Sequence, residues 1–90
     1  MFHELVNFIN GLRIGETFSR KDLRHILNWH YGSSVDVYRK GLCNLGFIEP
    51  TDVIGEYRKL KNVPPYINSA NYLDKDRIAH LEFKAKLEIL

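Results

Sequence analysis

The chain has 90 residues with 44% hydrophobic, 12% aromatic and 27% charged side chains, which is the composition of one folded domain rather than a disordered segment. A single cysteine, Cys43, excludes an internal disulfide, and no apolar run approaches the roughly 20 residues that a bilayer-crossing helix needs. The formal net charge of +2 is too small to indicate a nucleic-acid partner by itself.

The N-terminal part predicts a helix followed by a short extended segment. Apolar residues between Phe2 and Leu12 recur every three or four positions, which is the spacing of a helix with one buried face. Gly11 and Gly15 mark the end of this helix. The segment from Glu16 to Phe18 then leaves room only for a brief strand.

A second helix is predicted to begin after Ser19. The hydroxyl of Ser19 and the carboxylate of Asp22 have the spacing at which side chains cap a helix start. The apolar pattern continues to Trp29, so we expect the helix to end near that residue. Its inner face would consist of Leu23, Ile26 and Leu27, with Trp29 as a further candidate. Its outer face would carry Arg20, Lys21 and Arg24.

A third helix is predicted after a turn at His30 to Gly32. Either Ser33 or Ser34 is placed to cap this helix, and Gly46 is placed to end it with a left-handed C-cap. Its inner face would consist of Val35, Tyr38, Leu42 and Leu45.

The segment from Phe47 to Lys61 predicts a β-hairpin. Two β-rich runs are separated by a polar, glycine-containing loop between Pro50 and Gly55. We expect Val63 to Pro65 to end the second strand, because proline cannot continue a hydrogen-bonded ladder. This change of pattern divides the chain into a domain of residues 1–62 and a C-terminal part of residues 63–90.

The C-terminal segment from Asp74 fits two structures. Apolar and charged residues alternate from Leu81 to Ile89, as they would in a half-buried strand. The content of alanine, leucine, glutamate and lysine favours a helix, and Glu82 and Lys86 would form an ion pair along it, so we expect a helix. Such a helix has one apolar face with Ile78, Leu81, Ala85 and Ile89, and a second with Ala79, Phe83, Leu87 and Leu90.

The order helix, short strand, helix, turn, helix and hairpin resembles the winged helix-turn-helix superfamily over residues 2 to about 61. The matching segments are FSRKDLRHIL as the second helix, SSVDVYRKGLCNLGFIE as the recognition helix running into the wing, and GEYRKLKNVP as the second wing strand. The LxxLGFIE run is the most specific, because two inward leucines precede a glycine that turns the chain straight into a strand. The resemblance implies an α+β, mostly helical fold of three helices and a β-hairpin wing, here with an additional C-terminal helix.

The resemblance also implies binding to double-stranded DNA, as a small transcriptional regulator of the kind found in phages and viruses. The third helix would enter the major groove and the wing would lie on the DNA backbone. The helix starts after Ser19 and Ser33 would attract phosphates through their free backbone amides. The side chains implied as DNA contacts are Arg20, Lys21, Ser33, Ser34, Tyr38, Arg39, Lys40, Arg58, Lys59 and Lys61, with Arg39 placed to reach a base edge and Lys40 a phosphate.

The charge pattern supports this expectation only in part. Nine lysines and arginines against six acidic residues lie between residues 13 and 61, whereas the remaining C-terminal residues are balanced. Asp36, near the start of the third helix, would repel phosphate, and the hairpin carries Glu49, Asp52 and Glu56. The alternative is therefore a protein-interaction module that uses the third helix or the acidic wing to bind and inhibit a host protein.

The second apolar face of the C-terminal helix is a candidate dimer interface, formed by Ala79, Phe83, Leu87 and Leu90. Readers of this class commonly bind DNA as symmetric dimers, so that two recognition helices match two half-sites. The alternative is that both faces of the helix are core, because a small domain needs the cover.

No residue pattern indicates an enzyme, a cofactor or a metal. The sequence contains no GxSxG elbow, glycine-rich phosphate loop, CxxC or HExxH, and His25 and His30 are five residues apart across a predicted helix end. The N-terminal segment has neither a basic leader nor a small-residue cleavage site. We therefore expect a cytoplasmic protein without a membrane partner, in the host cytoplasm if the protein is viral.

Overall fold

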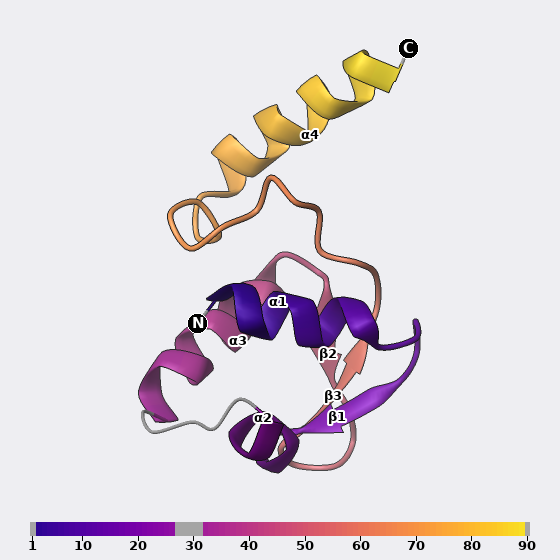
Figure 1. Ribbon diagram of the computed structural model, residues 1–90, viewed down its shortest axis with the longest axis vertical. Coiled ribbons are helices and arrows are strands. Elements are labelled where there is room, and N and C mark those ends of the chain that lie inside the picture. Colours follow the sequence, from indigo (N-terminus) through magenta and orange to yellow (C-terminus); the bar gives the residue numbers. More distant parts are fainter. Residues whose placement is uncertain (1, 27–31, 90) are drawn as a thin grey trace.

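Figure 1 shows the computed structural model, which describes the backbone of residues 2–26 and 32–89 and the side chains of these residues except 26, 32–35 and 89. This part of the chain forms an α+β fold with four helices and a three-stranded antiparallel sheet. In chain order the elements are α1 (Phe2–Gly11), β1 (Thr17–Ser19), α2 (Arg20–Ile26), α3 (Gly32–Asn44), β2 (Ile48–Pro50), β3 (Glu56–Lys59) and α4 (Lys75–Ile89).

The sheet has the strand order β1-β3-β2, and both pairings are antiparallel. The hairpin of β2 and β3 is confirmed, with its loop at residues 51–55. Gly55 has a φ of 82°, a conformation that glycine adopts without strain. The short strand expected after α1 is also confirmed, since Phe18 of β1 lies opposite Tyr57 of β3. Because β1 directly precedes α2, this pairing fixes the start of α2 beside the hairpin.

The start of α2 is capped as expected. The backbone N–H of Asp22 donates to Ser19 Oγ at 3.1 Å, and the N–H of Ser19 donates to Asp22 Oδ2 at 2.9 Å. This reciprocal pair is a capping box. The N–H of Arg20 donates to the carbonyl oxygen of Gly55 at 3.0 Å, so the hairpin loop also anchors the helix start.

The start of α3 differs from the expected position. The helix begins at Gly32, so Ser33 and Ser34 lie inside it, and the prediction that one of them precedes and caps the helix is wrong. Gly32 was expected to be part of the turn, because glycine is a weak helix former. The predicted end of the preceding helix near Trp29 lies outside the described residues.

The end of α3 is where the sequence predicts it. Gly46 has a φ of 83°, and the N–H of Phe47 donates to the carbonyl oxygen of Leu42 at 3.1 Å, which together make a left-handed C-cap. The chain then enters β2 directly. In contrast, β3 ends at Lys59, before the two prolines that were expected to end it.

The hydrophobic core of the described residues extends beyond the sheet into the segment that follows it. Val63, Ile67 and Tyr72 are buried in the same cluster as Leu5 of α1, although they follow the limit predicted at residue 62. The side chain of Asn10 fixes this segment. Its Oδ1 accepts from the N–H of Val63 at 2.8 Å, and its Nδ2 donates to the carbonyl oxygen of Val63 at 3.1 Å. We call α1 to β3 together with residues 60–74 the body.

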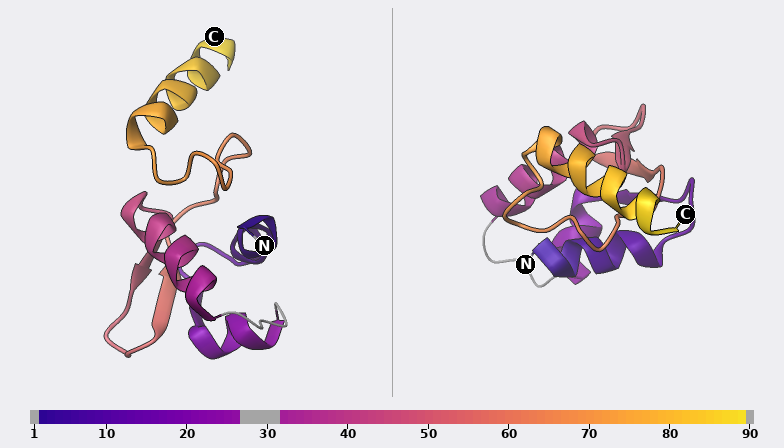
Figure 2. Two further views of the ribbon diagram at one scale, coloured as in Figure 1. Left: turned by 90° about the vertical axis from the view of Figure 1, so that its left-hand side faces the viewer. Right: turned by 90° about the horizontal axis from the view of Figure 1, so that it is seen from above.

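The C-terminal segment is helical, so the predicted helix is confirmed and the strand alternative is wrong. α4 lies at one end of the molecule, and α2 and the hairpin loop lie at the opposite end (Figures 1 and 2). Its first apolar face is turned toward the body, with Ile78 buried and Leu81 and Ala85 half-buried. The molecule measures 41 × 25 × 19 Å. None of the helices described combines the length and the apolar character needed to cross a bilayer.

Candidate nucleic-acid interface

One side of α3 is exposed and the opposite side packs on the core. Val37, Lys40 and Asn44 are exposed, and steps of three and four residues place them on the same side of the helix. Leu42 is fully buried and Tyr38 is half-buried against the core, so the inward positions predicted for these two residues are confirmed.

The segment after the sheet covers only one edge of α3. The ring of Tyr72 lies 5.3 Å from the rings of both Tyr38 and Phe2, measured between centroids. It also occupies the space beside Gly41. Val37 and Lys40 remain exposed. The outward side of α3 is therefore accessible to a partner.

Asp36 forms two ion pairs, one that joins α2 to α3 and one within α3. Arg20 lies 2.8 Å from Asp36 Oδ2, and Arg39 lies 3.3 Å from Asp36 Oδ1. The carboxylate expected to repel phosphate is thus flanked by two guanidinium groups, which offset its charge locally. The Arg20 pair also holds the start of α2 beside the first half of α3.

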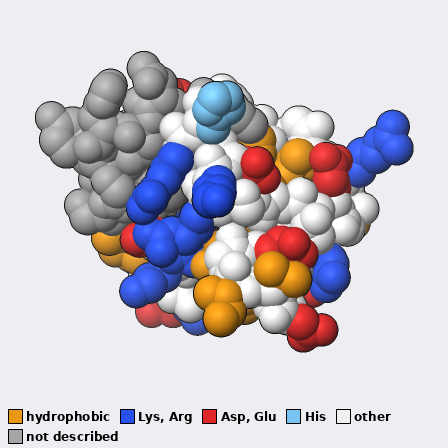
Figure 3. Space-filling view, turned by 90° about the horizontal axis from the view of Figure 1, so that it is seen from below, with side chains coloured by type: hydrophobic (Ala, Val, Ile, Leu, Met, Phe, Trp, Pro, Cys, Tyr) orange, Lys and Arg blue, Asp and Glu red, His pale blue; other side chains and the backbone are white. Residues whose placement is uncertain are grey.

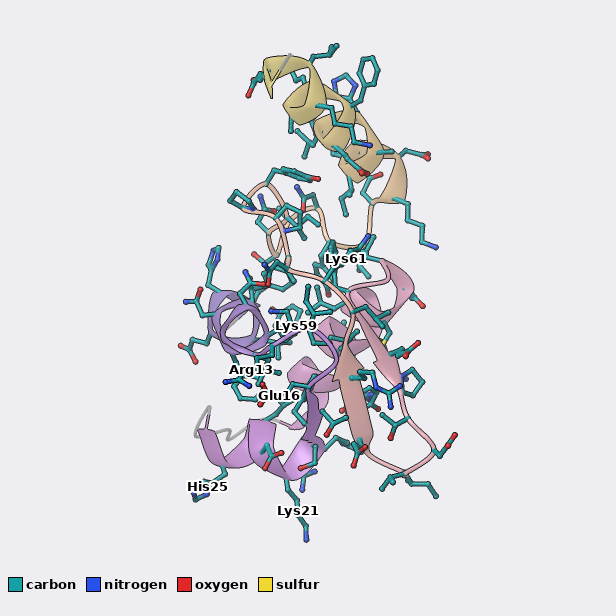
Figure 4. The ribbon with its side chains drawn as sticks, turned by 90° about the vertical axis from the view of Figure 1, so that its right-hand side faces the viewer. Arg13, Glu16, Lys21, His25, Lys59 and Lys61 are labelled. Carbon is teal, nitrogen blue, oxygen red and sulfur yellow. The ribbon has the colours of Figure 1, made fainter. Side chains whose placement is uncertain are left out.

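Exposed cations gather where α2 and α3 meet. Lys21 and Arg24 are exposed on α2, the side chain of Arg20 is 42% exposed, and Lys40 lies one helical turn beyond Asp36 on α3. We call Arg20, Lys21, Arg24 and Lys40 the basic patch. Figure 3 shows Lys and Arg side chains concentrated on one part of the face seen from below, and Figure 4 shows Lys21 pointing away from the body. Lys21, Arg24 and Lys40 form no ion pair with any described residue.

Arg39 is buried, contrary to the expectation that it faces outward. Only 8% of its surface is exposed. Its guanidinium group donates a hydrogen bond to the hydroxyl of Tyr57 and lies 4.6 Å from the centroid of that ring. Position 39 is at the border between the inner and outer sides of α3, and the aromatic ring of β3 draws the side chain inward. A base contact would require Arg39 to leave both Tyr57 and Asp36, so Arg39 is not part of the candidate interface.

Lys59 is also buried, although it was expected to contact the DNA backbone from the wing. Its exposed fraction is 1%. The ammonium group donates to the carbonyl oxygens of Leu12 at 2.6 Å and Asn10 at 3.3 Å. These carbonyls lie at the carboxyl end of α1, where a cation is favoured by the helix dipole. Lys59 therefore stabilises the fold and cannot reach a phosphate.

The other two wing cations are exposed, but Arg58 is paired with an acidic residue and Lys61 lies apart from the basic patch. Arg58 lies 3.2 Å from Glu49, its partner across the β2–β3 ladder. Lys61 lies 5.1 Å from the centroid of the Phe47 ring. Figure 4 shows Lys61 on the α4 side of the body, whereas Lys21 is at the opposite end.

At the start of α2, two of the backbone amides expected to attract phosphate already have acceptors. The N–H groups of Arg20 and Asp22 already donate to Gly55 and to Ser19. The contacts predicted for the side chains of Ser33 and Ser34 lie outside the described residues. These two amides are therefore not available to phosphate, whereas the side-chain charges of Arg20 and Lys21 are.

Arg24 is the cation that the predicted contact set omits. Sequence periodicity placed it on the outer face of α2, four residues after Arg20, so both arginines occupy the same side of that helix. The sequence therefore predicted the exposure of Arg24. Only the ion pair between Arg20 and Asp36, which joins α2 to α3, shows that the outer face of α2 adjoins Lys40.

Burial shifts the pKa values of two titratable groups on and beside α3. Burial raises the pKa of the Cys43 thiol, and the charge of Arg39 opposes that shift. Burial also raises the pKa of Tyr72, with Tyr38 adding to the effect. Within the described ranges, no group of three or more His, Cys, Asp or Glu side chains is placed to hold a metal ion.

Comparison of the chain with protein-family models, curated proteins and solved structures gives no match.

Proposed function

We propose that the protein binds double-stranded DNA through the basic patch, as a winged helix-turn-helix protein in which α3 enters the major groove and the β2–β3 hairpin is the wing. The observation that carries this proposal is the gathering of exposed cations from α2 and α3 on one face. The acidic residue between them, Asp36, is held by two arginines and so presents little negative charge to phosphate.

The exposed side of α3 suits a groove about 12 Å wide, which admits one α-helix. Asn44 is the type of side chain that pairs with adenine, Val37 can contact a thymine methyl group, and Lys40 can reach guanine or phosphate. These residues take the base-reading role that Arg39 cannot perform. Arg20, Lys21 and Arg24 are then placed to hold the DNA backbone and to fix the position of α3.

A salt titration with random-sequence duplex DNA tests this proposal. Contacts with several phosphates make log K fall linearly as log salt rises. The double variant Lys21→Ala with Arg24→Ala should bind more weakly and should reduce the slope by about 2, because each lost phosphate contact removes roughly one unit. The affinity is measured by fluorescence anisotropy at several salt concentrations.

Lys61→Ala is the matched control, since it removes an exposed lysine from the α4 side of the body. Its affinity and salt slope should equal those of the unchanged protein. Absence of binding at low salt, or equal losses in the control and the double variant, would contradict DNA binding through the basic patch.

A second candidate function is supported by the hairpin loop. Val53 and Ile54 are exposed at its tip beside Asp52, and Ile54 has no cover at all, with a relative exposure of 102%. An apolar projection with an acidic neighbour fits the groove of a protein partner better than a phosphate backbone. If no DNA binding is found at low salt, a protein partner that loses affinity for the Ile54→Ser variant would identify this function.

A further inference from the structure

The outer side of α4 is an apolar surface on a helix that projects from the body. Ala79, Phe83 and Leu87 are exposed and follow one another at four-residue steps, which places them along one line of the helix. Phe83 is 61% exposed and Leu87 is 53% exposed. We call these three residues the outer face of α4. Leu90, the fourth residue predicted for it, lies outside the described residues.

The body supports only the opposite side of this helix. Ile78 is buried, Leu81 and Ala85 are half-buried, and the direction midway between Leu81 and Ala85 is opposite to Phe83 on a helix of 3.6 residues per turn. A helix of this length is marginal in water unless one of its faces is packed. The intrahelical pair of Glu82 and Lys86, at 3.5 Å and exposed, adds little stability. A partner on the outer face would therefore stabilise the second half of α4.

We propose that the outer face of α4 binds the same face of a second copy of this chain, and that the resulting dimer holds two separate DNA segments. The second part rests on the proposed function. The first part does not.

A second copy complements this face. A twofold axis at Phe83 brings the two Phe83 rings together and sets the small side chain of Ala79 against Leu87 of the partner subunit. Glu82 and Lys86 lie along the same edge of the face, so antiparallel pairing of the helices places Glu82 beside Lys86 of the partner subunit, and reciprocally. The other edge carries His80 and Lys84, which are both exposed, and Lys84 is long enough to extend into solvent.

The position of the body decides what such a dimer can do. The outer face points away from the body, so a partner that packs on it has its own body on the far side of the helix pair. The basic patch lies at the end of the body remote from α4, as the place of Lys21 in Figure 4 shows. The two patches of the dimer therefore face in opposite directions. This geometry suits the bridging of two duplexes rather than two half-sites on one duplex.

Sedimentation equilibrium of the full chain tests the dimer without DNA. We expect a mass of twice 10.6 kDa for the unchanged protein and a single-chain mass for Phe83→Glu, whose circular dichroism should match. Ile14→Glu is the matched control, because it adds the same charge at another exposed apolar position, and it should remain a dimer. A single-chain mass for the unchanged protein, or a dimer that survives Phe83→Glu, would overturn the proposal and leave the face to a different partner.

A two-duplex assay tests the bridging. One duplex is immobilised and a fluorescent second duplex is added with the protein. The unchanged protein should retain the second duplex, whereas Phe83→Glu should bind the immobilised duplex and retain none of the second. A dimer that binds DNA but never recruits a second duplex would overturn the bridging alone. A dimer that binds no DNA would overturn the proposed function and the bridging together.

Discussion

The ammonium group of Lys59 closes the carboxyl end of α1 from inside the core. It reaches two carbonyl oxygens, those of Asn10 and Leu12, which the helix itself leaves without a hydrogen-bond donor. The backbone of the same residue pairs with Glu16, so the loop between α1 and β1 is held at both its side chain and its main chain. A single lysine thus joins α1 to the central strand of the sheet.

Lys59→Ala should lower the free energy of unfolding by about 2–4 kcal/mol, because it leaves a cavity and unpaired carbonyl groups. Lys61→Ala removes an exposed side chain two positions later. This variant should change the free energy of unfolding by less than about 0.5 kcal/mol. Chemical denaturation of the two variants measures the difference. Equal effects would show that the buried contacts of Lys59 contribute nothing to stability.

At the same scale, the sequence identified which residues are charged but not where those charges point. The predicted helix face and the predicted wing strand placed Arg39 and Lys59 outside, where cations usually lie. The hydroxyl of Tyr57 pairs with Arg39, and two carbonyl oxygens at the carboxyl end of α1 pair with Lys59, so both cations can be buried. These partners are far from the cations in the chain.

The segment that follows the sheet is fastened to α3 at a place where α3 has no side chain. A Cβ atom added to Gly41 would lie 2.5 Å from Cδ2 of Tyr72, a distance that real Cβ contacts do not show. Gly41 is thus needed in the middle of a helix, where glycine normally destabilises, because it lets an aromatic ring approach the backbone.

Gly41→Ala should destabilise the protein by about 1–3 kcal/mol through overpacking against Tyr72. Gly11→Ala is the control, since no atom lies within 4 Å of its added Cβ, and it should be neutral or slightly stabilising. Denaturation curves for Gly41→Ala, Tyr72→Leu and the double variant then give the coupling between the two sites. Purely additive losses would show that the ring is not what makes alanine unfavourable.

The helices and strands themselves were largely predictable, because their signals are local. The capping box of Ser19 and Asp22, the left-handed turn at Gly46 and the helical content of the C-terminal segment all depend on neighbours in the chain. The start of α3 was not predictable in the same way, since a glycine at its first position gives no helix signal.

At the scale of the whole molecule, the core continues past the sheet and the two ends of the molecule differ in character. Val63, Ile67 and Tyr72 belong to the core, so residues 60–74 are a structural part of the body. The end with α2 and the hairpin loop carries the basic patch, and the other end carries the apolar outer face of α4.

A chain that ends at residue 74 should therefore keep a cooperative unfolding transition, whereas a chain that ends at residue 62 should lose it. The shorter chain lacks the three buried side chains and leaves the amide of Asn10 without its partners on Val63. Thermal unfolding followed by circular dichroism compares the two chains. A sharp transition in the shorter chain would show that the core is complete without residues 63–74.

Sequence by itself determined the number, kind and order of most elements in this protein, because helical periodicity, caps and turn residues act over a few positions. Only the tertiary structure decided which cations face a partner, since that depends on residues brought together from α1, α3 and the sheet. It also decided that α2 and α3 share the basic patch and that α4 lies at the opposite end. The physical reason is that a charged side chain is stable in the interior only where polar groups pair with it. Packing, rather than the order of residues in the chain, brings those groups together.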